Sequence, residues 1–295
     1  MKIETKEISL PLLDEKEVRL FIKRIDKIHP FVSGNKWFKL KYNLLEAKKQ
    51  GLNTLLTFGG AYSNHISATA FAAKEKGINS IGIIRGEEHL PLNPTLRFAI
   101  DNGMKLHYIS RSNYKEKTSA NFLEALKNQF GDFYLIPEGG TNELAIQGAK
   151  EILDKNDIQD YICCPVGTGG TIAGIINASN DQQTVIGFPA IKGFEQLEKD
   201  INNWTNSTNC IFINDYVGNG YAKINKDLVD FINEFNARHN IPLDTIYTGK
   251  MMMGILDLVD KDFFLKGSSI LAIHTGGLQG NKGMSERLGI SLPLE

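Results

Sequence analysis

The sequence predicts an α/β protein with two lobes, each built on a mainly parallel, twisted sheet that is flanked by helices. Short apolar runs alternate with longer amphipathic runs along most of the chain, a pattern typical of parallel sheets covered by helices on both faces. The chain has 295 residues, and its many strand–helix units suggest more than one lobe. Polar, glycine-rich segments follow several of the apolar runs, where α/β proteins bind their ligands.

The composition excludes several classes of protein. Hydrophobic residues make up 42% of the chain and charged residues 23%, which is typical of a globular protein and not of a disordered one. Lys and Arg number 33, and Asp and Glu number 34, so the basic excess expected of a nucleic-acid binder is missing. Three cysteines are too few for a disulfide framework and favour buried free thiols in a reducing, cytoplasmic setting.

No segment has the pattern of a signal peptide, a membrane span or a metal site. The first residues lack the long apolar stretch of a signal peptide. Residues 161–180 are uncharged, but Pro165 and four glycines interrupt them, so we interpret them as strand, loop and helix. The six histidines have neither the spacing nor the cysteine neighbours of a zinc site, and we expect no metal.

Apolar runs bounded by turn residues predict the strands. In chain order we expect strands over 54–58, 80–85, 105–110, 132–137, 161–166, 184–190, 210–214 and 269–275. Between them, apolar residues recur at helical spacing after polar or proline starts. In chain order we expect helices over 63–76, 94–103, 114–130, 142–153, 171–178, 228–238 and 250–259.

The spacing of these units also predicts the domain organisation. About four strand–helix units lie between residues 45 and 150, which is enough for a small lobe. We therefore expect a smaller α/β domain of residues 46–150, inserted into a larger domain formed by residues 1–45 and 151–295. A bound ligand would lie in the cleft between the two domains, at the carboxyl ends of the strands.

The first segment with chemical content is GTGGT, residues 167–171, between an apolar strand and a helix of small residues. Glycines let backbone N–H groups approach an anion, threonine hydroxyls add donors, and the helix N-terminus adds partial positive charge. These properties predict a phosphate site, although the spacing differs from both the P-loop and G-x-G-x-x-G. The alternative is a tight strand-to-helix turn, but two adjacent glycines flanked by threonines exceed what a turn needs.

The second segment, GGAYSNH, places Ser63, Asn64 and His65 at the start of an alanine-rich helix. A helix N-terminus suits an anion, and here a substrate carboxylate is a candidate. One of these residues acting only as the helix cap is the simpler alternative. A hydrolase that uses Ser63 as its nucleophile is a further alternative, but Ser63 and His65 diverge at a helix start and no G-x-S-x-G elbow surrounds the serine.

The third segment, SGNKWFKLK, presents Lys36 at a helix start after the turn of residues 33–35. A cation is unfavourable at a helix N-terminus, so the pKa of Lys36 should fall. A lysine with a lowered pKa is nucleophilic, as Schiff-base chemistry requires. The alternative is that this basic run forms only a solvated helix face.

Two further motifs lie near the C-terminus. YTGK covers residues 247–250, and HTGG covers residues 274–277 after an apolar strand. The glycines of HTGG form another strand end that suits a ligand. Tyr247 could belong either to this site or to the core.

A Schiff-base lysine, a phosphate site and a polar helix start together suggest pyridoxal 5′-phosphate (PLP). The chain resembles the PLP-dependent enzymes of the tryptophan-synthase-β-like group (fold type II). Within that group it is similar to the family of 1-aminocyclopropane-1-carboxylate (ACC) deaminases and D-cysteine desulfhydrases. The motifs that carry the resemblance run through essentially the whole chain: GNKWFKL, GGAYSNH, PEGGTN, GTGGT, GYAK, YTGK and HTGG.

The resemblance implies how the cofactor is held. Lys36 would bind PLP covalently and later move protons at the substrate α-carbon. Asn64 would hydrogen-bond the 3′-oxygen of the ring, and Thr275 would face the ring nitrogen. The phosphate would be bound with the help of Lys39. The phosphate-binding loop would consist of Gly167, Thr168, Gly169, Gly170 and Thr171.

The resemblance also implies the substrate-binding and catalytic residues. Ser63, Asn64 and His65 would bind a small amino-acid substrate, with Ser63 and the His65 backbone at its carboxylate. Ser63 would also belong to the catalytic group. Tyr247 would act as an acid, base or nucleophile at the ring, and Tyr221 of GYAK matches a second active-site tyrosine. Relatives of this kind are homodimers, so we expect a homodimer that binds neither nucleic acid nor membrane.

Two threonines bear on the reaction. ACC deaminases look like YEGK in the fourth segment, with a glutamate at the ring nitrogen, whereas this chain has Thr248 there and Thr275 in HTGG. A hydroxyl favours a neutral ring nitrogen and a weaker electron sink. Expulsion of a thiolate tolerates a weaker sink better than opening a cyclopropane does. We therefore expect a D-cysteine desulfhydrase-like lyase that gives pyruvate, ammonia and sulfide, with ACC deaminase and a non-catalytic PLP-binding protein as alternatives.

Overall fold

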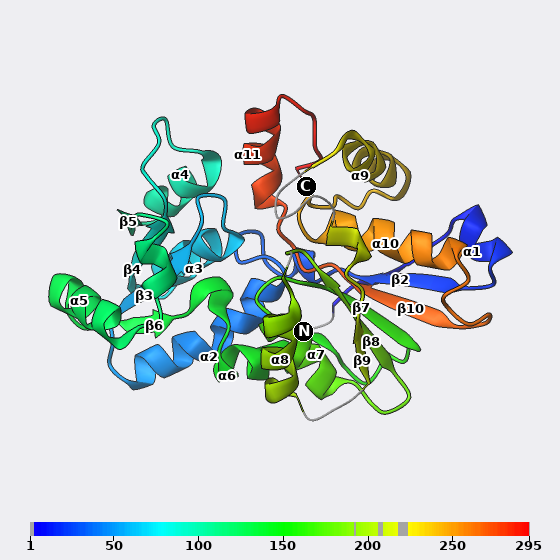
Figure 1. Cartoon of the computed structure of the whole chain (residues 1–295), viewed down its shortest axis with the longest axis horizontal. Coiled ribbons are helices and arrows are strands. Elements are labelled where there is room, and N and C mark those ends of the chain that lie inside the picture. Colours follow the sequence, from blue (N-terminus) through cyan, green and yellow to red (C-terminus); the bar gives the residue numbers. More distant parts are fainter. Residues whose placement is uncertain (1–2, 192, 206–208, 218–223, 295) are drawn as a thin grey trace.

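The computed structural model describes residues 3–191, 193–205, 209–217 and 224–294. Their strands form two sheets (Figure 1). The larger sheet has six strands in the order β1 (Thr5–Ile8), β2 (Arg19–Lys23), β10 (Ser269–Ile273), β7 (Tyr161–Val166), β8 (Thr184–Pro189) and β9 (Cys210–Phe212). The smaller sheet has four, in the order β5 (Met104–Ile109), β4 (Asn79–Arg85), β3 (Thr54–Gly59) and β6 (Tyr134–Ile136).

Both sheets are mainly parallel. Every strand pair in them is parallel except β1 with β2, where Thr5 lies opposite Lys23 in an antiparallel register. Helices flank both sheets, and in chain order they are α1 (Pro11–Glu15), α2 (Asn35–Lys49), α3 (Asn64–Glu75), α4 (Pro94–Asp101), α5 (Ala120–Phe130), α6 (Glu143–Ala149), α7 (Gly170–Ala178), α8 (Glu195–Trp204), α9 (Lys226–His239), α10 (Thr248–Asp260) and α11 (Gln279–Leu288). The predicted α/β fold class with parallel, helix-flanked sheets is confirmed.

The alternation of side chains along the strands explains why both faces of the larger sheet are covered. Ile270 and Ala272 of β10 face the core that α9 and α10 complete. Leu271 and Ile273 of the same strand face a second core, completed by α7 and by parts of α2, α6 and α8. In Figure 1 these two groups of helices lie on opposite sides of the six-stranded sheet.

Helix α2 belongs to the cores of both sheets. Phe38 packs into the second core of the six-stranded sheet, whereas Leu40 and Ala47 pack with Leu55 of β3 in a core of the four-stranded sheet. In Figure 1, α2 runs from the middle of the molecule toward the smaller sheet. The helix that carries the predicted cofactor lysine is therefore held from both sides.

Side-chain caps fix where several helices begin. Ser63, Asn93, Asn142 and Asn225 each accept a hydrogen bond from the backbone N–H three residues later. A cap also explains one difference from prediction. The helix expected over 114–130 is divided, because Ser119 caps α5 at its N-terminus after a separate helical turn at Asn113–Glu116.

The sequence patterns did not predict β1, β2, α1, α8 or α11. The elements β1, β2 and α1 are short, and α8 and α11 bury few side chains; α8, for instance, buries a single residue, Ile201. Within the part of the chain that the structure describes, no helix has both the length and the apolar character needed to cross a membrane.

Gly148 tests the packing of α2 on α6. A methyl group at Gly148 would overlap the carbonyl oxygen of Phe38. We expect Gly148→Ala to lower the free energy of unfolding by about 1–3 kcal/mol, the usual cost of overpacking. Gly280 is the matched control, since it is also helical and no atom lies within 4 Å of the added methyl group.

Gly280→Ala should raise the free energy of unfolding by about 0.5–1 kcal/mol, because alanine is the better helix former. Denaturant unfolding of both variants measures the two effects. A stabilised Gly148→Ala variant would contradict the close approach of α2 and α6.

Candidate active site

The glycine loop lies at the carboxyl end of β7 and begins α7. Gly169 adopts a positive φ of 82° and is the N-cap of that helix. A methyl group there would lie 2.9 Å from Ile201 and 3.1 Å from Trp204, and one at Gly170 would lie 3.3 Å from Nζ of Lys39. The backbone can approach its neighbours this closely only with glycine, and the first N–H groups of α7 remain available to an anion.

Lys39 is a buried cation surrounded by neutral oxygens. It is 1% exposed, and its Nζ donates to the Gly139 carbonyl at 2.6 Å, to Oγ1 of Thr141 at 2.8 Å and to Oγ1 of Thr168 at 3.4 Å. Burial, and then the positive charge of Lys36, hold the pKa of Lys39 well below its ordinary value. Among the described residues no carboxylate pairs with it, so this site fits an anionic group such as a phosphate.

Lys36 lies in the first turn of α2, where the side chain is half-buried. Desolvation lowers the pKa of its amine to about 8, and no charged partner among the described residues offsets this effect. At pH 7 about a tenth of the amine is therefore unprotonated and nucleophilic, far more than for a lysine of ordinary pKa. The lowered pKa expected from the sequence is present, and burial is its cause.

Contacts of the turn before Lys36 join two other predicted segments. The N–H of Asn35 donates to the Thr275 carbonyl at 3.1 Å, and Nδ2 of Asn35 donates to Oγ1 of Thr171 at 2.9 Å. Gly34 has a φ of 66°, and a methyl group on it would overlap the same Thr275 carbonyl. The turn that precedes Lys36 therefore lies between the end of β10 and the glycine loop.

Ser63 has the simple capping role. Its Oγ accepts from the Ile66 N–H at 3.3 Å. The N–H groups of Asn64 and His65 have no acceptor among the described residues, so the start of α3 can bind an anion.

The ring of His65 points into the interior and not toward Ser63. Nε2 lies 2.7 Å from Oγ1 of Thr57, and that hydroxyl donates to the Ile136 carbonyl, so Nε2 carries the proton. Burial, and then the charges of Lys36 and Lys39, hold the pKa of His65 well below its ordinary value. A Ser63–His65 catalytic pair is therefore absent, which disfavours the hydrolase hypothesis.

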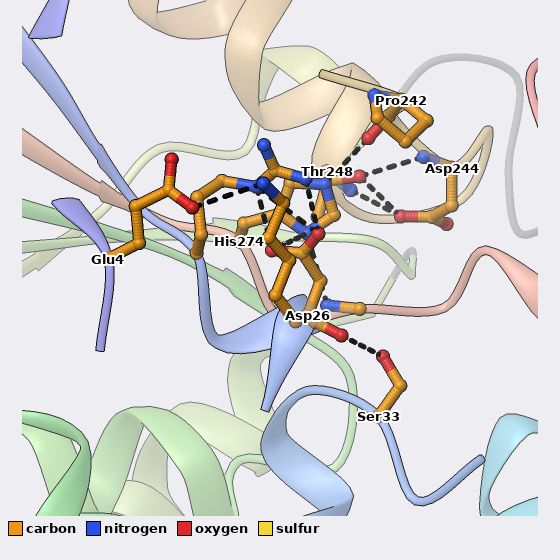
Figure 2. A network of polar contacts seen from close by, with 10 residues as sticks. Glu4, Asp26, Ser33, Pro242, Asp244, Thr248 and His274 are labelled. Atoms are coloured by element: carbon orange, nitrogen blue, oxygen red, sulfur yellow. Dashed lines mark hydrogen bonds and ion pairs between the residues drawn. The ribbon is translucent and has the colours of Figure 1, made fainter. Parts of the chain in front are cut away.

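Tyr247 packs on the glycine loop. A methyl group at Gly167 would lie 3.1 Å from Cε1 and 3.2 Å from the hydroxyl of Tyr247, and the tyrosine is only partly buried. The next residue, Thr248, is buried and exchanges hydrogen bonds with Asp244: its Oγ1 donates to Oδ1 at 2.7 Å and accepts from the Asp244 N–H at 2.8 Å (Figure 2). Thr248 is therefore the first residue of α10, and Asp244 engages both the donor and an acceptor of its hydroxyl.

The structure thus brings together most of the predicted site. Direct contacts connect Lys39, the glycine loop and Tyr247, and the Asn35 bonds add Thr275 and the turn of Lys36. The start of α3 connects more loosely, because the His65 ring lies against Gly140. Tyr221 lies outside the described residues.

The sequence patterns did not identify two residues that contact Lys39 in the candidate site. Gly139 and Thr141 lie in the segment after β6 and contact Lys39, although PEGGTN served only as a family motif. Two glycines followed by threonine at a strand end were the signal that could have identified them.

The three cysteines are free thiols. Cys163 and Cys164 are buried in β7, and burial raises the pKa of both. Burial also raises the pKa of Cys210 to about 12. Among the described residues no group of His, Cys, Asp or Glu could hold a metal ion.

Comparison with known proteins identifies the cofactor. The family model described as pyridoxal-phosphate dependent enzyme matches residues 3–276. The chain belongs to this family. Its cofactor is therefore pyridoxal phosphate, as the sequence predicted, and the unpaired charge of Lys39 beside the glycine loop fits the phosphate of that group.

Several proteins that are similar to this PLP enzyme carry more specific names. It is 31% identical over 284 residues to a Pyrococcus abyssi protein named "Putative 1-aminocyclopropane-1-carboxylate deaminase", which covers 89% of this chain and 86% of that one. It is 33% identical to the Arabidopsis thaliana "Bifunctional D-cysteine desulfhydrase/1-aminocyclopropane-1-carboxylate deaminase, mitochondrial" (88% and 73% covered). The crystal structure of an ACC deaminase homologue superposes with a TM-score of 0.84 at 26% identity, covering 98% and 93% of the two chains.

The lowered pKa of Lys36 predicts how PLP capture depends on pH. Only the unprotonated amine attacks an aldehyde, so the rate of capture by the apoprotein should rise with pH and level off above about 8. Stopped-flow absorbance of the lysine-bound cofactor measures this rate. Lys36→Ala should show no such absorbance, and a rate still rising steeply at pH 10 would contradict the lowered pKa.

Lys39→Met tests the phosphate site. Losing a hydrogen bond to a charged group costs about 1.5–3 kcal/mol, so PLP should bind roughly 10- to 100-fold more weakly. Pyridoxal, which lacks the phosphate, is the matched control ligand and should bind both proteins equally. Equal losses for PLP and pyridoxal would mean that Lys39 does not contact the phosphate.

Proposed function

We propose that the chain is a PLP-dependent lyase of the D-cysteine desulfhydrase type, which converts a small D-amino acid and water to pyruvate, ammonia and the released β-substituent. With D-cysteine that substituent leaves as sulfide. The observation that carries this proposal is the absence of a carboxylate at residue 248. The hydroxyl of Thr248 is hydrogen-bonded to Asp244, and the side chain of Thr275 can offer the ring nitrogen only a hydroxyl.

The cofactor, once bound, withdraws electrons from the substrate α-carbon. A neutral ring nitrogen beside a hydroxyl makes this withdrawal weaker than a carboxylate partner would. Elimination of a thiolate needs less assistance than opening an unactivated cyclopropane. Thr248 and Thr275 therefore favour β-elimination over opening of the cyclopropane ring.

In this proposal the phosphate is held by Lys39 and by the glycine loop, Gly167–Thr171. Lys36 would hold the cofactor covalently, and its amine would take and return the proton at the substrate α-carbon. Its lowered pKa supports this role, because the amine can change protonation state near neutral pH. Thr275 faces the ring nitrogen, and Asn64 donates to the ring oxygen.

The start of α3 would hold the substrate. Ser63 and the N–H of His65 would bind the substrate carboxylate. In support, the N–H groups of Asn64 and His65 find no acceptor in the part of the chain that the structure describes. Tyr247, which packs on the glycine loop, would act as acid or base at the ring. Tyr221 keeps the role of a second tyrosine as a prediction from the sequence.

We further propose that residues 46–150 form the smaller domain, with the cofactor between them and the larger domain of residues 1–45 and 151–295. The four-stranded sheet, whose strands all lie within 54–136, supports this division. A cytoplasmic homodimer acting in amino-acid metabolism is the corresponding proposal for assembly and location, and three unpaired cysteines suit a reducing compartment.

ACC deaminase is the second candidate, since relatives over most of the chain carry that name. It would open the cyclopropane ring of ACC and give 2-oxobutanoate and ammonia. It would require the ring nitrogen to be activated without a carboxylate at residue 248. Both candidate activities would use the same proposed cofactor contacts of this chain. Only the reaction products can therefore distinguish the two activities.

The deciding experiment is an assay of the PLP-loaded protein with D-cysteine and with ACC, with L-cysteine as the stereochemical control. We expect pyruvate and sulfide from D-cysteine, little 2-oxobutanoate from ACC, and no turnover by Lys36→Ala. Comparable 2-oxobutanoate release from ACC would overturn the argument from Thr248 and Thr275. A yellow protein that is inactive with all three compounds would exclude both candidates and favour the non-catalytic PLP-binding protein.

A further inference from the structure

A buried histidine links the three segments that carry Lys36, Tyr247 and Thr275. His274 follows β10 and immediately precedes Thr275, and its side chain is 0% exposed. Figure 2 shows its ring among residues from the start of the chain and from the loop before α10. No step of the proposed reaction uses this ring.

Hydrogen bonds on both sides of the ring fix one neutral tautomer. Nε2 lies 2.7 Å from the Pro242 carbonyl, and because a carbonyl only accepts, Nε2 carries a proton. Nδ1 accepts from the N–H of Gly276 at 3.3 Å, so Nδ1 carries none. The ring therefore holds the loop before Tyr247 with one nitrogen and the turn after Thr275 with the other.

A neighbouring ion pair explains why Nδ1 remains free for Gly276. Oδ1 of Asp26 lies 3.5 Å from Nδ1, and an unpaired carboxylate there would favour a proton on that nitrogen. Arg24 instead donates to both oxygens of Asp26, at 2.7–3.2 Å, and both residues are buried. A second carboxylate near this turn, that of Asp244, lies against Gly277. Its oxygens accept hydrogen bonds from the backbone N–H groups of residues 246–248, at the start of α10.

The same network extends to the turn before Lys36. Oγ of Ser33 donates to the Asp26 carbonyl at 2.9 Å, and a methyl group at Gly276 would lie 3.0 Å from that Oγ. The Asn35 N–H then bonds the Thr275 carbonyl. A change in the turn of Gly276 would therefore move Thr275 relative to the start of α2.

We propose that His274 is a positioning residue. As a neutral ring protonated on Nε2, it holds the turn of residues 275–277 against the first turn of α2, and so sets Thr275 relative to the cofactor bound at Lys36. The inference rests on the proposed placement of Lys36 and Thr275 and goes beyond it by naming the group that maintains their relative geometry. The Arg24–Asp26 pair engages the carboxylate nearest Nδ1 and so leaves that nitrogen to accept from the N–H of Gly276.

Two variants separate the hydrogen bonds of the ring. His274→Asn places a carbonyl oxygen near the position of Nδ1 and can keep the bond from Gly276. His274→Gln places an amide N–H near Nε2 and can keep the bond to Pro242. Each variant loses one bond, so a purely structural histidine would give two similar proteins.

We expect His274→Asn to keep the visible absorption maximum of lysine-bound PLP and nearly wild-type PLP affinity. His274→Gln should shift that maximum and bind PLP about tenfold more weakly, the effect of one lost hydrogen bond. Titration of each apoprotein with PLP, without substrate, measures both quantities. Imidazole ¹⁵N–¹H correlation spectra of the wild-type protein read the tautomer of His274 directly and should show the Nε2–H form.

Asn281→Ala is the matched control. Nδ2 of Asn281 donates to the carbonyls of Leu243 and Pro293 at 3.0 and 2.8 Å, so it ties the carbonyl beside that of Pro242 without bonding to residues 274–277. This variant should lower the melting temperature and leave the PLP spectrum unchanged. A spectral shift in Asn281→Ala, equal behaviour of the two His274 variants, or a cationic or Nδ1–H ring would overturn the proposal.

The proposed function and the proposed role of His274 can be contradicted by different results. Wild-type protein that forms no lysine-bound chromophore would contradict the proposed role of Lys36, and with it the proposed function. Wild-type protein that forms the chromophore while both His274 variants retain its spectrum and affinity would contradict only the role of His274.

Discussion

The Lys39 ammonium group lies in the interior with one carbonyl and two hydroxyls as its partners. Neutral oxygens stabilise a buried positive charge far less than an anion does, so a proton on this amine carries an electrostatic cost, and the pKa of Lys39 is held well below its ordinary value. The close approach that Gly170 permits keeps the helix start of α7 beside this charge. Binding of the cofactor phosphate relieves the cost, so cofactor occupancy and the stability of the fold are linked.

Helix α2 transmits this constraint to the rest of the molecule. Phe38 and Leu40 anchor it in the cores of the two sheets. Lys39 lies between these two residues, and Lys36 lies on the same helix, two residues before Phe38. A displacement of one sheet relative to the other would therefore move Lys36 and Lys39 together, and with them the proposed attachment point of the cofactor and the proposed partner of its phosphate. Gly34 also restricts movement of the start of α2 relative to β10, since its backbone lies in close contact with the Thr275 carbonyl.

Local chemistry could be predicted from the sequence, whereas contacts between distant segments could not. Ser63 as a cap and the glycine loop after β7 follow from neighbouring residues, and the structure agrees with both. A lowered pKa of Lys36 is expected from its place at a helix start, but its cause is burial, which depends on distant segments. The roles of Gly139 and Thr141 depend on contacts with Lys39 across about a hundred residues of chain. The inward turn of His65 depends likewise on Thr57 of the neighbouring strand, and a polar side chain at a helix start gives no indication of such a partner.

The thiols of β7 have a consequence for the durability of the catalyst. An enzyme that releases sulfide works among polysulfides, which form when sulfide is oxidised and which modify cysteines through their thiolates. Burial keeps Cys163 and Cys164 protonated and away from solvent, and Cys210 ionises only near pH 12. Thiols of this kind are inert, so the strand that leads to the glycine loop should resist modification by the product of the proposed reaction.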